Sequence, residues 1–231
     1  LAGKMWLNED DTHTYLATEE SPGWKDHVNT IEDTNRELVR NVAQASLRNF
    51  GTWWMDLCRS GWFNDARMWG EMKRLAPLDE AMLKNPAPFR PEVAAVVDER
   101  AMLRTSAKSQ HVTWPGVYES RRALGRMGAP FGQYLLDDVL AGRVRAKLYV
   151  LLNPWDLTDA DRAKLNEVTR GATRIWCVPP GTGPAVTNAL VRNETGLSYF
   201  YDKLSLTPDY LREAARTAGV SVSGRHSGTR I

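Results

Sequence analysis

Blocks of apolar and polar residues along the chain predict short strands and helices in turn. In the first third these blocks are residues 3–9, 30–49 and 52–57. The middle block repeats apolar positions at helical spacing, whereas the outer two are short and strand-prone. Thr30 can cap the helix with Asp33 at its third position, and Phe50-Gly51 is expected to end it. Strand, helix and strand in this order predict one βαβ unit.

A proline-rich segment then divides the chain. Residues 65–84 are expected to form one or two helices, broken by Pro77. Residues 85–91 follow and hold three prolines, a composition that is typical of a stiff linker. The sequence therefore predicts a boundary between an N-terminal part, residues 1–84, and a second domain, residues 92–219.

Strand-like runs alternate with helical patterns after the linker. Strands are expected at residues 93–97, 147–152 and 172–178, and helices at residues 116–127, 131–141, 158–169, 183–193 and 208–218. Alternation of this kind predicts a parallel sheet with helices on both faces. We therefore expect an open, mostly parallel α/β domain that ends in a flexible tail at residues 220–231.

Composition and charge are those of a globular protein. The 231 residues are 42% apolar and 25% charged, which is close to average usage. The 30 Lys and Arg residues nearly balance the 28 Asp and Glu residues, which argues against nucleic acid or a membrane surface as a partner. Because no apolar run approaches 18 residues, no transmembrane helix is predicted.

The two cysteines, Cys58 and Cys177, do not indicate a disulfide framework and are compatible with the cytoplasm. Bulky residues surround Cys177, so it lacks the small neighbours that a nucleophile at a strand-to-helix elbow requires. We interpret both cysteines as structural thiols.

Two glycine-rich segments resemble phosphate-binding turns but lack the full pattern. Residues 181–183 follow a predicted strand, but Val186 stands where the phosphate-binding pattern needs a glycine. Residues 125–132 are interpreted as a helix-to-helix corner. We therefore expect no cofactor.

Three carboxylates and a histidine follow the first predicted strand: Glu9, Asp10, Asp11 and His13. The carboxyl ends of strands face the active site in βα architectures, and a glutamate there can act as nucleophile or general acid/base. Two other interpretations stay open. Asp10 and Asp11 can form a solvated turn with Thr12, or Glu9, Asp11 and His13 can hold a metal ion, although their spacing matches no specific ligand pattern.

Tryptophan is the outlier in the composition, with nine residues against five phenylalanines. Trp53 and Trp54 are adjacent in the second predicted strand, and Asp56 follows them. Adjacent strand residues point to opposite faces, so the two tryptophans cannot both fill a core on one side. At least one can face a site, where its flat ring would stack on a sugar; packing in a core is the alternative.

Seven segments together carry a family resemblance. They are Gly3-Lys-Met-Trp-Leu-Asn-Glu9-Asp-Asp-Thr12, Gly51-Thr-Trp-Trp-Met-Asp-Leu57, Gly61-Trp-Phe-Asn64, Ala94-Ala-Val-Val-Asp-Glu99, Ala129-Pro-Phe-Gly-Gln-Tyr-Leu-Leu-Asp-Asp-Val139, Ala146-Lys-Leu-Tyr-Val-Leu-Leu152 and Ala172-Thr-Arg-Ile-Trp-Cys177. In this order they resemble the β-galactosidase-like glycoside hydrolases of family 42. Those enzymes have a catalytic (β/α)8 barrel, followed by a flavodoxin-like or amidotransferase-like trimerisation domain. The first two segments are similar to the seventh and eighth barrel strands.

The resemblance implies a retaining hydrolase acting on a carbohydrate, assembled as a homo-oligomer, with Glu9 as its nucleophile. The residues that it assigns to substrate binding are Asp10, Asp11, His13, Trp53, Trp54 and Asp56. A retaining mechanism also needs a second carboxylate about 5–5.5 Å from the nucleophile. In this family the second carboxylate belongs to the fourth strand, which nothing in the chain matches.

Most of the barrel is absent from the sequence. A closed barrel takes eight strands in about 250 residues, whereas residues 1–84 supply two. We therefore expect the chain to be a C-terminal fragment of a hydrolase and to be inactive alone. The alternative is a non-catalytic oligomerisation module of α/β fold, because exposed barrel strands would leave unpaired edges.

Overall fold

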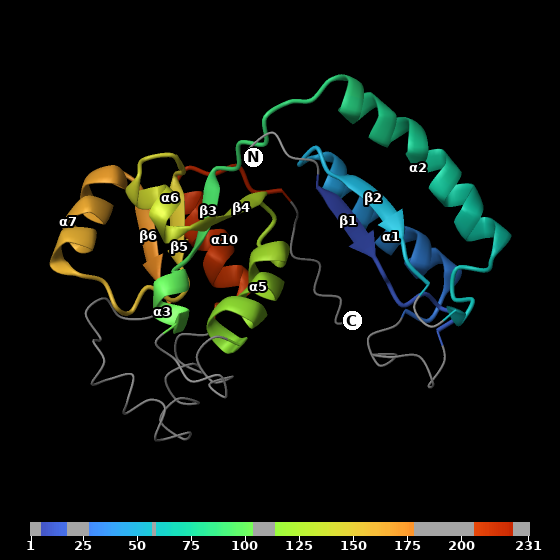
Figure 1. The fold of residues 1–231 in the computed structure, drawn as a ribbon, viewed down its shortest axis with the longest axis horizontal. Helices are drawn as coiled ribbons and strands as arrows, with labels where there is room; N and C mark the ends of the chain where they lie inside the picture. Colours follow the sequence, from blue (N-terminus) through green and yellow to red (C-terminus); the bar gives the residue numbers. More distant parts are fainter. Residues whose placement is uncertain (1–5, 18–27, 57–58, 104–113, 178–205, 224–231) are drawn as a thin grey trace, which may run out of the picture. The chain divides into compact units, whose positions relative to one another are not determined.

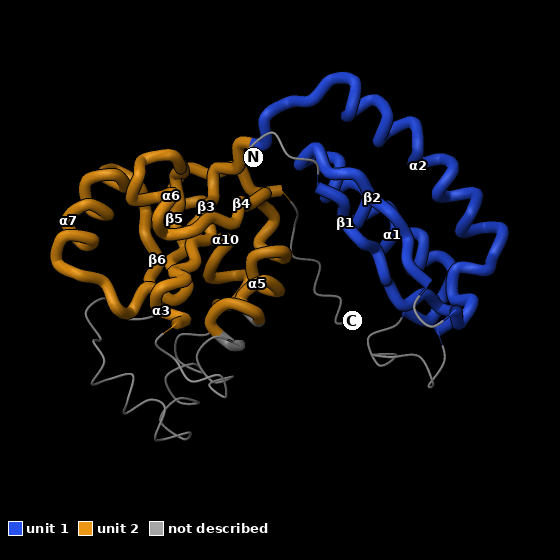
Figure 2. The backbone as a smooth tube through the Cα atoms, in the orientation of Figure 1, with its two compact units in different colours: residues 1–89 blue, residues 90–231 orange. Residues whose placement is uncertain are grey.

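The computed structural model describes residues 6–17, 28–56, 59–103, 114–177 and 206–223. The chain divides into two compact units, Leu1–Phe89 and Arg90–Ile231 (Figure 2). The division falls inside the proline-rich segment. Cys58, the glycine pair at residues 181–183 and the helix expected at residues 183–193 lie outside the described residues. Among the helices of these ranges, none has the length and apolar character needed to span a membrane.

The first unit is a parallel two-stranded ribbon with two helices. Its elements are β1 (Leu7–Asp10), α1 (Ile31–Ser46), β2 (Gly51–Trp54) and α2 (Ala66–Lys84) (Figure 1). β1 and β2 pair in parallel, with Leu7 beside Gly51 and Asp10 beside Trp54. Because α1 connects the two strands, the predicted βαβ unit is confirmed.

Local capping fixes the ends of α1. The Thr30 side chain accepts a hydrogen bond from the Asp33 backbone N–H, as the sequence predicts. The C-terminal end differs from the expectation. The residue that takes the left-handed conformation is Asn49, with φ 58°, and Gly51 instead begins β2. Asparagine tolerates this conformation better than most residues, so no glycine is needed there.

Helix α2 runs without interruption through Pro77, so the expected break is wrong. Pro77 is exposed, and water can therefore satisfy the carbonyl group that the proline leaves without a donor. The α1 and α2 helices pack on each other, and the Ser46 hydroxyl donates to Asp79 Oδ1 between them. Their shared core contains Ile31, Leu38, Val42, Trp62, Phe63, Met68, Met72 and Leu75.

The second unit is an open parallel sheet. Its strands are β3 (Val93–Val97), β4 (Phe131–Leu135), β5 (Leu148–Leu151) and β6 (Thr173–Trp176), in the spatial order β4-β3-β5-β6. All neighbouring strands are parallel. The first strand lies between the second and third, as in doubly wound folds. The predicted open α/β class is therefore confirmed.

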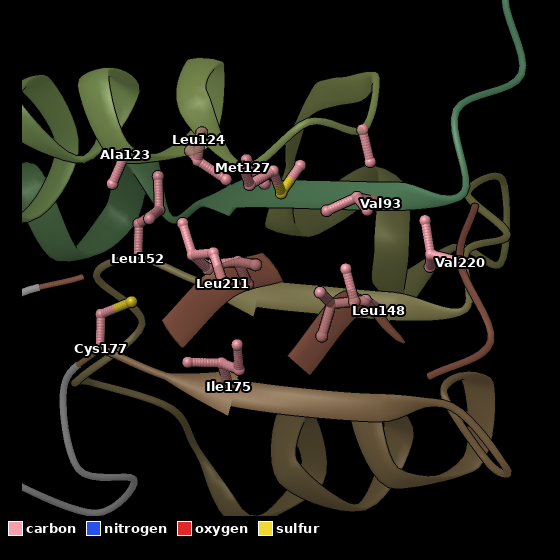
Figure 3. Packing of buried hydrophobic residues seen from close by; sticks show 14 residues of the cluster. Val93, Ala123, Leu124, Met127, Leu148, Leu152, Ile175, Cys177, Leu211 and Val220 are labelled. Carbon is pink, nitrogen blue, oxygen red and sulfur yellow. The ribbon is translucent and has the colours of Figure 1, made fainter. Parts of the chain in front are cut away.

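Helices cover both faces of this sheet. The helices of the unit are α3 (Glu99–Leu103), the π-helix η3 (Trp114–Glu119), α5 (Ser120–Arg126), α6 (Leu136–Leu140), α7 (Asp159–Val168) and α10 (Pro208–Thr217). α5 and α10 pack on one face, where Leu124 and Leu211 meet Val93 and Leu148 (Figure 3). α6 and α7 pack on the other face through a separate apolar cluster. Strand residues alternate between the two clusters, as a sheet buried on both sides requires.

Two expectations for this unit are corrected. Residues 131–141 are not one helix, because Phe131–Leu135 pairs with β3 as an edge strand and only Leu136–Leu140 is helical. Residues 125–132 consequently join a helix to a strand, not a helix to a helix.

The start of the expected flexible tail is ordered, so that prediction is wrong for residues 220–223. Val220 is buried against the α10 side of the sheet, and the Ser223 N–H donates to the Gly128 carbonyl at 2.7 Å. This short segment therefore belongs to the packed unit.

Candidate functional site

The two faces of the β1–β2 ribbon have different surroundings. Trp54, on one face, packs with the α1–α2 core. Glu9 and Trp53 are register partners on the opposite face and are both exposed. Leu7 shares that face and is 53% exposed, so an apolar strip beside Glu9 has no cover within the described residues. We call this surface, made of Leu7, Glu9, Gly51 and Trp53, the open face.

Glu9 lies near the carboxyl end of β1 on the open face. Its carboxylate makes no hydrogen bond or ion pair in the described part of the chain. Trp53, its register partner, is 41% exposed. A ligand that binds on the open face, away from the helices, can therefore contact both the Glu9 carboxylate and the Trp53 ring.

Asp10 is buried, in contrast to its two neighbours. Its Oδ1 accepts hydrogen bonds from the Thr12 N–H at 3.1 Å and the Thr12 hydroxyl at 2.5 Å. The Asn41 amide on α1 donates to both carboxylate oxygens at 3.1 Å. The solvated-turn interpretation is therefore wrong for Asp10. Its carboxylate ties the end of β1 to α1 and is not available to a substrate.

Asp11 and His13 are not brought together with Glu9 in a metal site. Asp11 is exposed, and His13 lies edge-on against Trp62 with ring centroids 4.7 Å apart. No group of three potential metal-ligating side chains occurs among residues that the structure describes. The metal interpretation consequently has no geometric support there.

A small pocket lies at the carboxyl end of β2. It has a volume of about 190 Å³ and is lined by Trp54, Asp56, Phe63, Asn64 and Trp69. The Asp56 carboxylate is held in the loop after β2, because it accepts from the Ser60 N–H and hydroxyl and from the Gly61 N–H. The pocket brings together two residues that the sequence singled out, Trp54 and Asp56. It also includes Asn64, which sequence reasoning missed because no motif marks it.

A charged triad joins the loops that follow the two strands. The Tyr15 hydroxyl donates to Asp65 Oδ2, and Arg67 donates to the same carboxylate through its backbone N–H and its guanidinium, both at 2.7 Å. The hydrogen bonds from Arg67 and then Tyr15 hold the pKa of Asp65 well below its usual range. The bond to Asp65 raises the pKa of Tyr15. Tyr15 is about fifty residues away in sequence, so no local pattern predicts this contact.

In the second unit the carboxyl ends of β3 and β5 are tied together. The Asp98 N–H donates to Asn153 Oδ1 at 2.7 Å, and Asn153 Nδ2 donates to the Asp98 carbonyl at 2.9 Å. Arg100 lies 3.4 Å from Asp98 and 3.3 Å from Asp161. These contacts neutralise the acidic residues where doubly wound sheets commonly bind ligands.

Cys177 is buried beyond the end of β6. Burial raises the pKa of its thiol to about 12, so the thiolate required for nucleophilic attack is scarce at neutral pH. The interpretation of Cys177 as a buried structural thiol is confirmed.

Comparison with known protein families, curated proteins and solved structures finds no match for this chain.

Proposed function

We propose that the first unit is the end of a (β/α)8 barrel from a retaining glycoside hydrolase of β-galactosidase type, with Glu9 as the nucleophile. The position of Glu9 carries the proposal: it is exposed beside Trp53, near the carboxyl ends of parallel strands, on the face away from the helices. In a closed barrel the helices lie outside, and catalytic residues come from the carboxyl ends of the strands.

The environment of Glu9 suits the nucleophilic step. Glu9 would attack the anomeric carbon of the sugar, while an acid/base carboxylate protonates the leaving oxygen. Water then releases the sugar from the glycosyl-enzyme, with the same acid/base residue taking a proton from it. Asp10 would act as a positioning residue, because it anchors the segment directly after Glu9 to α1.

In this proposal the acid/base residue belongs to a further barrel strand, because no second strand carboxylate lies beside Glu9 in the described part of the ribbon. The two strands of the ribbon pair only with each other among the described residues. Parallel sheets normally have both faces covered, so the open face favours completion by further barrel strands. The 231-residue chain alone is therefore expected not to hydrolyse glycosides.

The proposal is tested in an intact protein that supplies the remaining strands. Glu9→Gln should lower the turnover of an aryl β-galactoside by about a thousandfold or more. Glu32→Gln is the matched control, because Glu32 is an exposed glutamate on α1, away from the open face, and it should retain most activity. Full activity in Glu9→Gln would refute the assignment, as would turnover by the 231-residue chain that survives this substitution.

The open face also favours a second candidate function, a non-catalytic association module. Leu7 and Trp53 leave apolar area uncovered, and unpaired strand edges promote association. Light scattering should then give a mass above that of one chain, and Leu7→Lys should reduce it. Leu83→Lys, at a similarly exposed leucine on α2, should have no effect. A wild-type monomer at high concentration would exclude this function.

A further inference from the structure

The pocket at the end of β2 is separate from the open face. Trp54 and Trp53 are adjacent in β2, so their side chains leave the strand on opposite sides. Trp54 packs with the helix-side core and lines the pocket, whereas Trp53 is the register partner of Glu9. A ligand in this pocket would therefore not occupy the position next to Glu9.

Three aromatic side chains from different segments form most of the pocket. Trp54 comes from β2, Phe63 from the following loop and Trp69 from the first turn of α2. Within the described residues none of these three rings stacks on another ring. Trp69 is 56% exposed and lines the pocket together with the buried Phe63. Its ring is thus free to contact a ligand.

Polar groups lie beside the rings. Asp56 is fixed by its three hydrogen bonds and keeps acceptor capacity, since two carboxylate oxygens offer about four lone pairs. The Asn64 side chain is exposed and makes no hydrogen bond in the described part of the chain. An amide supplies both donors and an acceptor. The buried Trp54 Nε1 also lacks an acceptor among the described residues.

We infer that this pocket binds a single neutral sugar ring, as an accessory subsite apart from the catalytic carboxylate. A pyranose has an apolar C–H face, which suits the negative face of an aromatic ring, and a rim of hydroxyls, which suits Asp56 and Asn64. The volume of about 190 Å³ is below that of drug-sized sites and matches a small ligand. The choice of a sugar among small ligands rests on the proposed function.

A quaternary ammonium ion is the closest competitor, because such ions bind in aromatic cages. Among the described residues of the pocket lining, Asp56 is the one that carries a charge, and three donated hydrogen bonds already stabilise it. A quaternary ammonium ion can neither donate a hydrogen bond to the Asn64 amide nor accept one from it. A sugar hydroxyl can do both. The polar groups therefore favour a sugar.

The test is a titration of the 231-residue chain with methyl β-galactoside, followed through the indole N–H signals in NMR spectra. The Trp54 and Trp69 signals should shift with saturation, and Trp69→Ala should weaken binding by about 3- to 10-fold. Trp6→Ala is the matched control, because Trp6 is 59% exposed and lies outside the pocket. It should bind as wild type does. An unchanged unfolding midpoint for Trp69→Ala would show that the fold is intact.

Several outcomes would overturn the inference. No binding up to high millimolar sugar would do so, as would binding that Trp53→Ala removes and Trp69→Ala does not. Saturable shifts with tetramethylammonium but not with the sugar would identify a cation site instead. The nucleophile assay on Glu9 is independent of all these readouts. Failure of the accessory subsite is therefore distinguishable from failure of the proposed hydrolase.

Discussion

At the scale of single residues, the three successive acids after β1 have different roles. Glu9 is exposed on the open face, Asp10 is buried, and Asp11 is exposed in the turn. Glu9 and Asp10 are adjacent in β1, so their side chains lie on opposite faces of the strand. Asp10 anchors the turn because its carboxylate accepts hydrogen bonds from the Asn41 amide. Sequence identified the acids as a group, but only the fold distinguishes the anchor from the accessible group.

Removal of the Asp10 carboxylate should destabilise the first unit. Asp10→Ala removes the acceptor of the Thr12 N–H and hydroxyl, and it leaves the Asn41 amide only its bond to the Thr12 hydroxyl. The free energy of unfolding should therefore fall by about 2–4 kcal/mol. Asp11→Ala, which removes an exposed acid, should change it by less than about 0.5 kcal/mol. Urea denaturation followed by tryptophan fluorescence measures both. Equal effects of the two substitutions would contradict the anchoring role.

The triad of Tyr15, Asp65 and Arg67 predicts a pH dependence. The pKa of Asp65 is lower in the folded state than in an unfolded chain, where it is about 3.9. Its ionised form therefore stabilises the fold above about pH 4, and this stabilisation is lost as the pH falls further, toward the folded-state pKa.

Asp65→Asn keeps a good N-cap for α2 but removes this charge. The variant should consequently lose stability less steeply than wild type between about pH 4 and pH 2. Asp11→Asn is the control and should follow the wild-type curve. Thermal unfolding at a series of pH values provides the measurement, and parallel curves for Asp65→Asn and wild type would count against the triad.

At the scale of elements, the turn between α5 and β4 depends on one glycine. Gly128 has φ +87°, and a Cβ added there would lie 2.2 Å from the Ser223 carbonyl oxygen. Gly128→Ala should therefore destabilise the second unit by about 1–3 kcal/mol. Gly125 is exposed within α5 with open space around it. Gly125→Ala should stabilise the unit by up to about 1 kcal/mol.

Chemical denaturation gives the change in unfolding free energy for each alanine variant. Gly128→Ala tests backbone strain, and Gly125→Ala tests helix propensity. Opposite signs are expected for the two changes in unfolding free energy. A neutral effect of Gly128→Ala would contradict the packing of residues 220–223 on this turn, and destabilisation by Gly125→Ala would contradict the open space around Gly125.

Elements with local signals were predicted well, and those decided by distant contacts were not. Thr30 and Thr158 cap α1 and α7 through hydrogen bonds to residues three positions later, so a short stretch of sequence identifies both helix starts. Phe131–Leu135 is a strand because it pairs with β3, more than thirty residues earlier. Pro77 is tolerated because its face of α2 is exposed, which local sequence does not reveal.

At the scale of the whole molecule, the two units differ in how completely their sheets are covered. The second unit buries β3 and β5 on both faces between pairs of helices. The first unit has an apolar core on one face of its ribbon and the open face on the other. This asymmetry is the physical basis for proposing that further strands complete the first unit.

The candidate site was predicted in part. The alternation of side chains along β2 correctly predicted that Trp53 and Trp54 lie on opposite faces of the strand. Glu9 was expected near the end of its strand, where the structure has it. The pocket was not predicted, because it depends on how the loop after β2 brings Phe63, Asn64 and Trp69 beside Trp54. The family resemblance assigns Asp10 to substrate binding. Its anchoring contact with Asn41 was not predicted, because the two residues are 31 positions apart in sequence.

The central claim, that Glu9 is a glycosidase nucleophile, is tested most directly by trapping the covalent intermediate. A protein that contains this chain together with the proposed remaining barrel strands is treated with a fluorinated β-galactoside that inactivates retaining enzymes, digested, and analysed by tandem mass spectrometry. If Glu9 is the nucleophile, one added sugar should be found on the peptide that contains β1, located on Glu9 and absent from Glu9→Gln. A sugar attached to any other carboxylate of an inactivated enzyme would contradict this assignment.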